Sequence, residues 1–134
     1  MATLLNLKSV RDSRGSLTVL DNIEDWIPFP IKRIFFIHQA KDSVRGGHRH
    51  FFTQHAVICI AGSCVVTIHS EGCEQEILLD TPEQCLIIDC NDWHTMHHFS
   101  SDAVLLALAS TNYDPTDYIY QSRQTSSGII AEKK

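Results

Sequence analysis

Short apolar or alternating runs recur along this chain about every ten residues, and this rhythm is the feature that most limits its fold. The runs are rich in Val, Ile, Phe and Thr, and Gly, Asp, Asn or Pro separates each from the next. The clearest runs are residues 16–22, 31–38, 55–62, 63–70, 75–80, 84–89 and 103–110. Short, regularly spaced strands of this kind predict an all-β domain, built as an antiparallel sandwich or barrel.

Two segments refine this prediction. In CVVTIHSEGCEQEILL, residues 64–79, two runs flank Ser70–Gly72, which predicts a hairpin with its turn there. Helix character is confined to 114–124, where Asp114 can cap a short helix and Pro115 suits its first position. We therefore expect one domain over residues 1–122 with a short C-terminal helical turn, followed by a flexible tail over 123–134.

Composition excludes several classes of function. The 134 residues suffice for one core, and a net charge of -5 argues against a general grip on nucleic acid or anionic membrane. No apolar run approaches the ~20 residues that span a bilayer, and the N-terminus does not resemble a secretory signal. The five cysteines are an odd number and include no C-x-x-C pair, which favours free thiols over a disulfide framework. We expect a cytoplasmic protein.

Histidines gather in two stretches that carry the candidate chemistry. In a strand, His48 and His50 project from the same face. His55 has the opposite parity, so it joins them only if the chain turns around residues 51–53. His94 lies in the second stretch, and a small barrel holds about one ligand. The candidate site is therefore formed by these histidines, with His55 conditional on the turn.

The spacing of these histidines resembles the cupin superfamily. Its first motif is H-x-H, an acidic residue, and then glycine, which here corresponds to His48, His50, His55 and Gly62. His94 matches the histidine of the second cupin motif. The chain departs from the pattern at His55, which stands where an acidic ligand is usual.

The resemblance narrows to one family. The segments DSRGSL, IPFPIKRIFFI, RGGHRH, ICIAGSC, WHTMHHFSSDAVLLALAS and YDPTDYI follow in the order of the WxcM-like sugar 3,4-ketoisomerases, from residue 7 to about residue 120. This resemblance implies a metal-free cupin, a β-barrel or jelly roll, usually a homodimer that exchanges N-terminal strands. It implies an isomerase that converts dTDP-4-dehydro-6-deoxy-glucose to its 3-dehydro isomer. A PLP-dependent aminotransferase then uses the product to make amino sugars for surface polysaccharide such as lipopolysaccharide O-antigen.

The resemblance also implies site residues. Its catalytic pair falls on His48 and His50, and neutral imidazoles titrating near ~6.5 suit proton transfer through an enediol. Arginines can hold a diphosphate or an enediolate, and aromatic rings can stack on thymine. The combination of Arg14 with His94 resembles the members that form the galacto product. The candidates for substrate binding are Arg14, Arg45, His94, His55, Phe36 and Trp93.

The sequence differs from the usual family pattern at two places in this expected pocket. The family usually has Tyr-Tyr where this chain has Phe35 and Phe36, and the second tyrosine belongs to the active site. It usually has glutamine where this chain has His55. One hypothesis is that His55 replaces the missing hydroxyl as a proton carrier.

Two alternatives stay open. A metal-dependent cupin would hold one divalent metal on His48, His50, His55 and His94. A non-catalytic module would bind the nucleotide sugar without exchanging its carbon-bound protons. The remaining histidines and the polar and aromatic residues of the C-terminal turn are expected to be structural: His38, His69, His97, His98, Tyr113, Asp114 and Tyr118.

Overall fold

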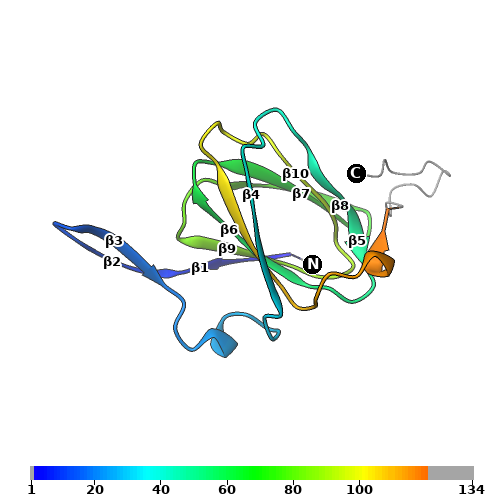
Figure 1. The fold of residues 1–134 in the computed structure, drawn as a ribbon, viewed down its shortest axis with the longest axis horizontal. Helices are drawn as coiled ribbons and strands as arrows, with labels where there is room; N and C mark the ends of the chain where they lie inside the picture. Colours follow the sequence, from blue (N-terminus) through cyan, green and yellow to red (C-terminus); the bar gives the residue numbers. More distant parts are fainter. Residues whose placement is uncertain (1, 121–134) are drawn as a thin grey trace.

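Two five-stranded sheets face each other and hold the main hydrophobic core between them (Figure 1). The structure, a computed structural model, describes residues 2–120. The first sheet has the order β1-β9-β6-β11-β4, formed by β1 (Thr3–Asn6), β9 (Gln84–Ile88), β6 (His55–Ala61), β11 (Val104–Ala109) and β4 (Arg33–His38). The second has the order β12-β5-β10-β7-β8, formed by β12 (Tyr118–Ile119), β5 (Arg45–His50), β10 (Trp93–His97), β7 (Cys64–Ser70) and β8 (Cys73–Leu79).

The predicted all-β antiparallel fold is confirmed. Neighbouring strands in both sheets pair in antiparallel fashion. Within residues 2–120, no ladder joins the two sheets into a closed barrel, so the architecture is the jelly roll of the two that were expected.

Strand β6 is apolar on both faces because both faces are covered. Val57 and Cys59 belong to the core between the sheets. Ala56 and Ile58 face outward and pack in a second cluster that includes Ile27 from the connection before β4. This double burial explains why the run at 55–62 reads as continuously apolar rather than alternating.

The predicted hairpin of β7 and β8 is confirmed. Ser70 pairs with Cys73, and the two residues between them, Glu71 and Gly72, have φ values of 51° and 81°. Two successive positive φ values are characteristic of the tight turns that match the twist of a β-hairpin.

A second hairpin stands apart from the two sheets. Strands β2 (Lys8–Asp12) and β3 (Gly15–Val19) pair with each other and project away from the jelly roll (Figure 1). The paired side chains Val10 and Leu17 are each 62% exposed. A 3-10 turn, η1 (Ile23–Asp25), follows this hairpin.

The C-terminal helical turn is also confirmed. It is the 3-10 turn η2 (Pro115–Asp117), in which the Asp114 side chain accepts a hydrogen bond from Thr116 N–H. The chain then becomes extended because β12 pairs with β5. The tail expected over 123–134 lies outside the described residues. No helix within residues 2–120 has the length and apolar character needed to cross a bilayer.

Candidate active site

Four imidazole rings converge between the two sheets and form what we call the histidine cluster. His48 and His50 come from β5, His94 comes from β10, and His55 comes from β6 in the facing sheet. Ring centroids lie 4.8 Å apart for His48–His50, 5.1 Å for His48–His94, 5.0 Å for His50–His55 and 6.0 Å for His55–His94. The structure thus brings together all four histidines that the sequence nominated.

The backbone explains how the cluster forms. His48 pairs directly with His94 across β5 and β10, and the register then shifts so that Thr95 lies opposite Gly46. Gly46 has a φ of +87°, and a Cβ there would lie 2.8 Å from the carbonyl oxygen of His94. The chain leaves β5 after His50 and enters the other sheet at His55. The turn required by the parity argument is therefore a crossing between sheets.

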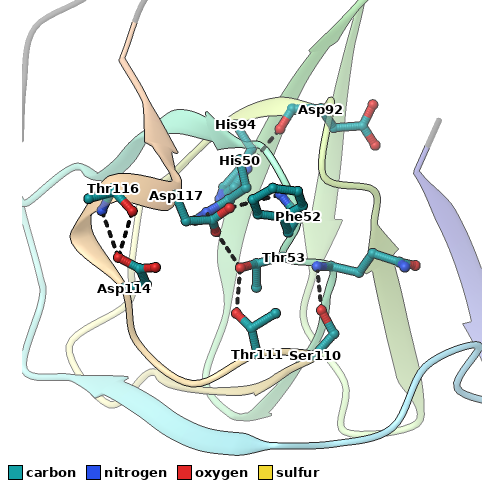
Figure 2. A network of polar contacts seen from close by, with 11 residues as sticks. His50, Phe52, Thr53, Asp92, His94, Ser110, Thr111, Asp114, Thr116 and Asp117 are labelled. Carbon is teal, nitrogen blue, oxygen red and sulfur yellow. Dashed lines mark hydrogen bonds and ion pairs between the residues drawn. The ribbon is translucent and has the colours of Figure 1, made fainter.

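A buried carboxylate, Asp117 of η2, holds one end of the cluster (Figure 2). Its Oδ2 lies 2.8 Å from His50 Nδ1, and its Oδ1 accepts a 2.8 Å hydrogen bond from Phe52 N–H. The Thr53 hydroxyl also donates to this carboxylate. Since Nδ1–H of His50 donates to a carboxylate, the Nε2 lone pair is left for chemistry in the cluster. Asp117 was missed from the sequence, where the one signal is an acidic residue within an aromatic C-terminal turn.

The carboxylate stays ionised near neutral pH. Burial acts to raise the pKa of Asp117, but hydrogen bonds from Thr53, Phe52 N–H and His50 outweigh burial and hold that pKa below its ordinary value. For His50, burial is the largest effect and lowers the pKa below 6.5, although the bond to Asp117 and its charge act in the opposite direction. His50 is therefore a neutral imidazole paired with a charged carboxylate.

The other buried imidazoles are neutral as well. Burial lowers the pKa of His94 to about 4, partly offset by the contact of its Nδ1 with the Asp92 carbonyl at 3.0 Å. Burial, followed by the charges of neighbouring histidines, lowers the pKa of His55 to about 2. A group that resists protonation this strongly is a poor proton carrier near neutral pH. The lowered pKa of His55 therefore argues against this residue as a replacement for the lost hydroxyl in that role.

A cavity of about 500 Å³ lies beside the cluster and gives it a place for substrate. Arg45 and His48 share its wall, so the expected position of Arg45 at the site is supported. The rest of the lining is Val44, Gly46, Tyr113, Tyr118 and Tyr120. The Tyr118 ring lies 4.7 Å from His48 and 4.6 Å from His50, which makes it a pocket residue rather than only part of a turn.

The aromatic pair of β4 divides between two faces. Phe35 turns inward, and its ring meets His55 edge-on at 5.9 Å. Phe36 is 59% exposed and lies beside His38, so the expectation that Phe36 lines the site is not met in this chain. Strand alternation gives one residue of such a pair to each face, and here the inner one is Phe35.

Arg33 is a second residue that the sequence did not single out. It shares the inward parity of Phe35, and its guanidinium carbon lies 5.4 Å from the Phe35 ring and 5.8 Å from the Tyr113 ring. Its charge contributes to lowering the pKa values of His50 and His55. A cation thus lies near the cluster, on the sheet opposite to Arg45.

Trp93 and Arg14 are not brought to the cluster. Trp93 has the opposite parity to His94, its ring lies 5.1 Å from His69, and its Nε1 donates to the Tyr120 carbonyl at 3.4 Å. Arg14 lies between β2 and β3 with its guanidinium 2.7 Å from the Asp12 carboxylate. In one chain, the hairpin of β2 and β3, which includes Arg14 in its turn, projects away from the two sheets that carry the histidine cluster (Figure 1).

The remaining histidines have other neighbours. His97 Nε2 lies 2.7 Å from the Thr67 hydroxyl, and the two Nδ1 atoms of His97 and His98 are 2.5 Å apart. His38 is exposed on β4.

Comparison with known proteins places these features in a family. Residues 1–127 match the family described as FdtA: WxcM-like, C-terminal. The curated TDP-4-oxo-6-deoxy-alpha-D-glucose-3,4-oxoisomerase of Aneurinibacillus thermoaerophilus is 43% identical over 119 residues, which cover 88% of this chain and 85% of the relative.

Solved structures agree with this match. A 3,4-ketoisomerase from Helicobacter canadensis is 38% identical, with a TM-score of 0.83 over 90% of each chain. QdtA, a sugar 3,4-ketoisomerase from Thermoanaerobacterium thermosaccharolyticum in complex with TDP, is 37% identical, with a TM-score of 0.83 over 90% of this chain and 88% of QdtA.

Proposed function

The chain belongs to the FdtA family, WxcM-like, C-terminal, and from this premise we propose that it is a sugar-nucleotide 3,4-ketoisomerase. The proposed substrate is a dTDP-linked 4-dehydro-6-deoxy-hexose, and the product is its 3-dehydro isomer. The observation that carries the assignment to particular residues is the pair His50–Asp117, which orients a buried imidazole directly beside His48, a residue of the cavity wall.

In the proposed reaction His50 is the base. Its Nε2 removes the proton from C3 of the sugar, and the electron pair forms a C3=C4 double bond as the C4 carbonyl oxygen becomes an enediolate oxygen. Protonation of O4 and of C4, together with loss of the O3 proton, then completes the 3-ketone and leaves a hydroxyl at C4. Asp117 stabilises the imidazolium that His50 becomes. His48, whose ring lies 4.8 Å from that of His50, is the proposed second proton-transfer group.

Two arginines have complementary places in this scheme. Arg45, on the cavity wall, suits the diphosphate, because a guanidinium donates two parallel hydrogen bonds to an anion. Arg33, near the Phe35 ring, suits the negative charge that develops on the enediolate. No cofactor is needed for this chemistry, since the protons are exchanged between imidazoles and sugar.

The direct test is proton NMR of the metal-stripped protein with dTDP-4-dehydro-6-deoxy-glucose in D2O. We expect the C3 proton signal to disappear and a 3-keto sugar to appear, whereas His50→Asn should do neither. If the folded protein binds the nucleotide but exchanges no carbon-bound proton of the sugar, this chain is a binding module instead.

We also propose a homodimer that exchanges N-terminal strands. The hairpin of β2 and β3 projects from the jelly roll with Val10 and Leu17 exposed, and an isolated two-stranded hairpin is marginally stable in water. In such a dimer Arg14 would complete the site of the partner.

Subunit complementation tests this dimer. Arg14→Ala and His50→Asn chains should each have low activity, and mixed dimers should recover a fraction of it, since one of their two sites is intact. Light scattering that gives a monomer, or mixing that restores nothing, contradicts the exchanged dimer.

The biological setting completes the proposal. A 3-keto sugar nucleotide is a substrate for a PLP-dependent aminotransferase, which would lead to amino sugars of surface polysaccharide. All five cysteines are free thiols, which suits a reducing cytoplasm. Cell fractionation and product analysis with an added aminotransferase test these two points.

A further inference from the structure

Three ring nitrogens in the histidine cluster are spaced for a metal ion. His48, His50 and His94 each offer one nitrogen, and these atoms all lie within 4.8 Å of one another. Nitrogens that bind a tetrahedral ion at about 2.0–2.1 Å are roughly 3.4 Å apart. Side-chain rotations that move the three nitrogens by about an ångström would therefore bring them to this spacing.

Two of these histidines already have the outer partners that orient metal ligands. His50 Nδ1 meets the Asp117 carboxylate at 2.8 Å, and His94 Nδ1 meets the Asp92 carbonyl at 3.0 Å (Figure 2). Such contacts fix the ring orientation and leave Nε2 as the ligand atom. His50 is 1% exposed, and its Nε2 has no hydrogen-bond partner among the residues that the structure describes.

His55 supplies a fourth imidazole from the opposite sheet. It is 5% exposed, its ring lies 5.0 Å from that of His50, and its Nδ1 has no hydrogen-bond partner within residues 2–120. Imidazole ligands favour zinc, copper and nickel, whereas magnesium and calcium prefer oxygen ligands. The donor set therefore selects a transition metal.

We propose that the histidine cluster binds one divalent transition-metal ion, zinc in the first instance, and that the bound ion inhibits isomerisation. The Nε2 lone pair of His50 can take a proton from the sugar or bind a metal, but it cannot do both. Binding follows from the cluster alone, while inhibition rests on the proposed function. His55 is thus the proposed fourth ligand of the ion, and His50 is the group whose proton transfer the ion blocks.

Calorimetric titration of the metal-stripped protein with Zn²⁺ tests binding without reference to activity. We expect one ion per chain, and Co²⁺ should give the visible absorption of a four-coordinate site with nitrogen ligands. His55→Gln should weaken zinc binding by about 10-fold or more, because outer-shell changes alone cost about 10–100-fold. The matched control, His38→Gln, makes the same substitution on an exposed histidine of β4 and should bind as the parent does.

Activity then tests inhibition. Stoichiometric Zn²⁺ should stop C3 proton exchange in the parent, EDTA should restore it, and Mg²⁺ should have no effect. The zinc concentration that halves exchange, measured relative to the same protein without zinc, should be about 10-fold or more higher for His55→Gln than for the parent. If His55→Gln does not fold, as judged by circular dichroism, the partly exposed His48 takes its place in the binding titration as His48→Gln.

The outcomes distinguish zinc binding, inhibition by zinc and the isomerase activity itself. Absence of zinc binding overturns the proposal, and so does binding that is unchanged in both cluster variants. Exchange that requires zinc overturns inhibition and makes the metal a cofactor. Zinc binding in the cluster of a protein that never exchanges the sugar proton supports the site but overturns both inhibition and the proposed isomerase.

Discussion

At the scale of single residues, Asp117 decides which nitrogen of His50 is available. A histidine without an oriented partner can present either ring nitrogen to a ligand, whereas a carboxylate on Nδ1 selects the tautomer with a free Nε2 lone pair. Asp117 is itself held by Thr53 and by Phe52 N–H, so it cannot swing away from His50. His50, the proposed base, is therefore positioned by η2, the turn that follows the last long strand.

Replacing Asp117 should lower kcat more than replacing the neighbouring carboxylate, Asp114, does. We expect Asp117→Asn to lower kcat by about 100-fold or more, because an amide no longer stabilises the imidazolium or fixes its tautomer. The matched control is Asp114→Asn in the same 3-10 turn, where the side chain caps Thr116 N–H and does not touch His50. Equal losses in kcat for both variants would mean that Asp117 only holds the turn together.

The pH dependence of kcat/KM should report the environment of His50. A base works when it is unprotonated, and burial holds the pKa of His50 below 6.5. We therefore expect the acidic limb of the profile to have its midpoint below pH 6.5, with full activity above it. Asp117→Asn should move this midpoint further down, since Asp117 raises the pKa of His50. A midpoint clearly above pH 6.5 would place the base elsewhere.

At the scale of elements, the pairing of β5 with β10 determines the spacing of the cluster. The register shift after His94 lets β5 approach closely, and the approach needs a residue without Cβ at Gly46. Gly46 is thus part of the site, although it has no side chain to offer.

Gly46→Ala tests this dependence. Left-handed strain alone costs about 1–2 kcal/mol, and overpacking against the His94 carbonyl adds about 1–3 kcal/mol. Gly72→Ala is the matched control, because Gly72 has a φ of +81° but no heavy atom within 4 Å of the added Cβ. Urea unfolding should show the larger loss at Gly46, together with a lower kcat. Equal losses at the two positions would show that the close approach to β10 is not tight.

At the scale of the whole molecule, the jelly roll encloses several uncharged imidazoles between its sheets. His94 is 2% exposed and His55 is 5% exposed, and they lie on different sheets. Their protonation would place positive charges in a volume that also contains His50, so the fold and the charge state of the cluster are linked.

This linkage predicts loss of stability in acid. The pKa of His94 is about 4 in the folded protein and 6.5 ordinarily, so the unfolded chain takes up the proton first as the pH falls. The free energy of unfolding should decrease between pH 6.5 and pH 4, by up to roughly 3 kcal/mol from this group. His55 acts in the same direction down to about pH 2. Urea titrations across this range should give a shallower decrease for His94→Gln than for His38→Gln; identical slopes would contradict the assignment.

The strand rhythm, the hairpin turn, the short C-terminal turn and the grouping of His48, His50 and His94 could be predicted from the sequence, because each depends on local periodicity or a short motif. The roles of Asp117 and Arg33, the inward turn of Phe35 and the distance of Arg14 from the cluster could not. These depend on which strands face each other and on where a turn some sixty residues away docks. Local propensity determines the elements, while the packing of two sheets decides which side chains share one buried volume and therefore which atoms carry the chemistry.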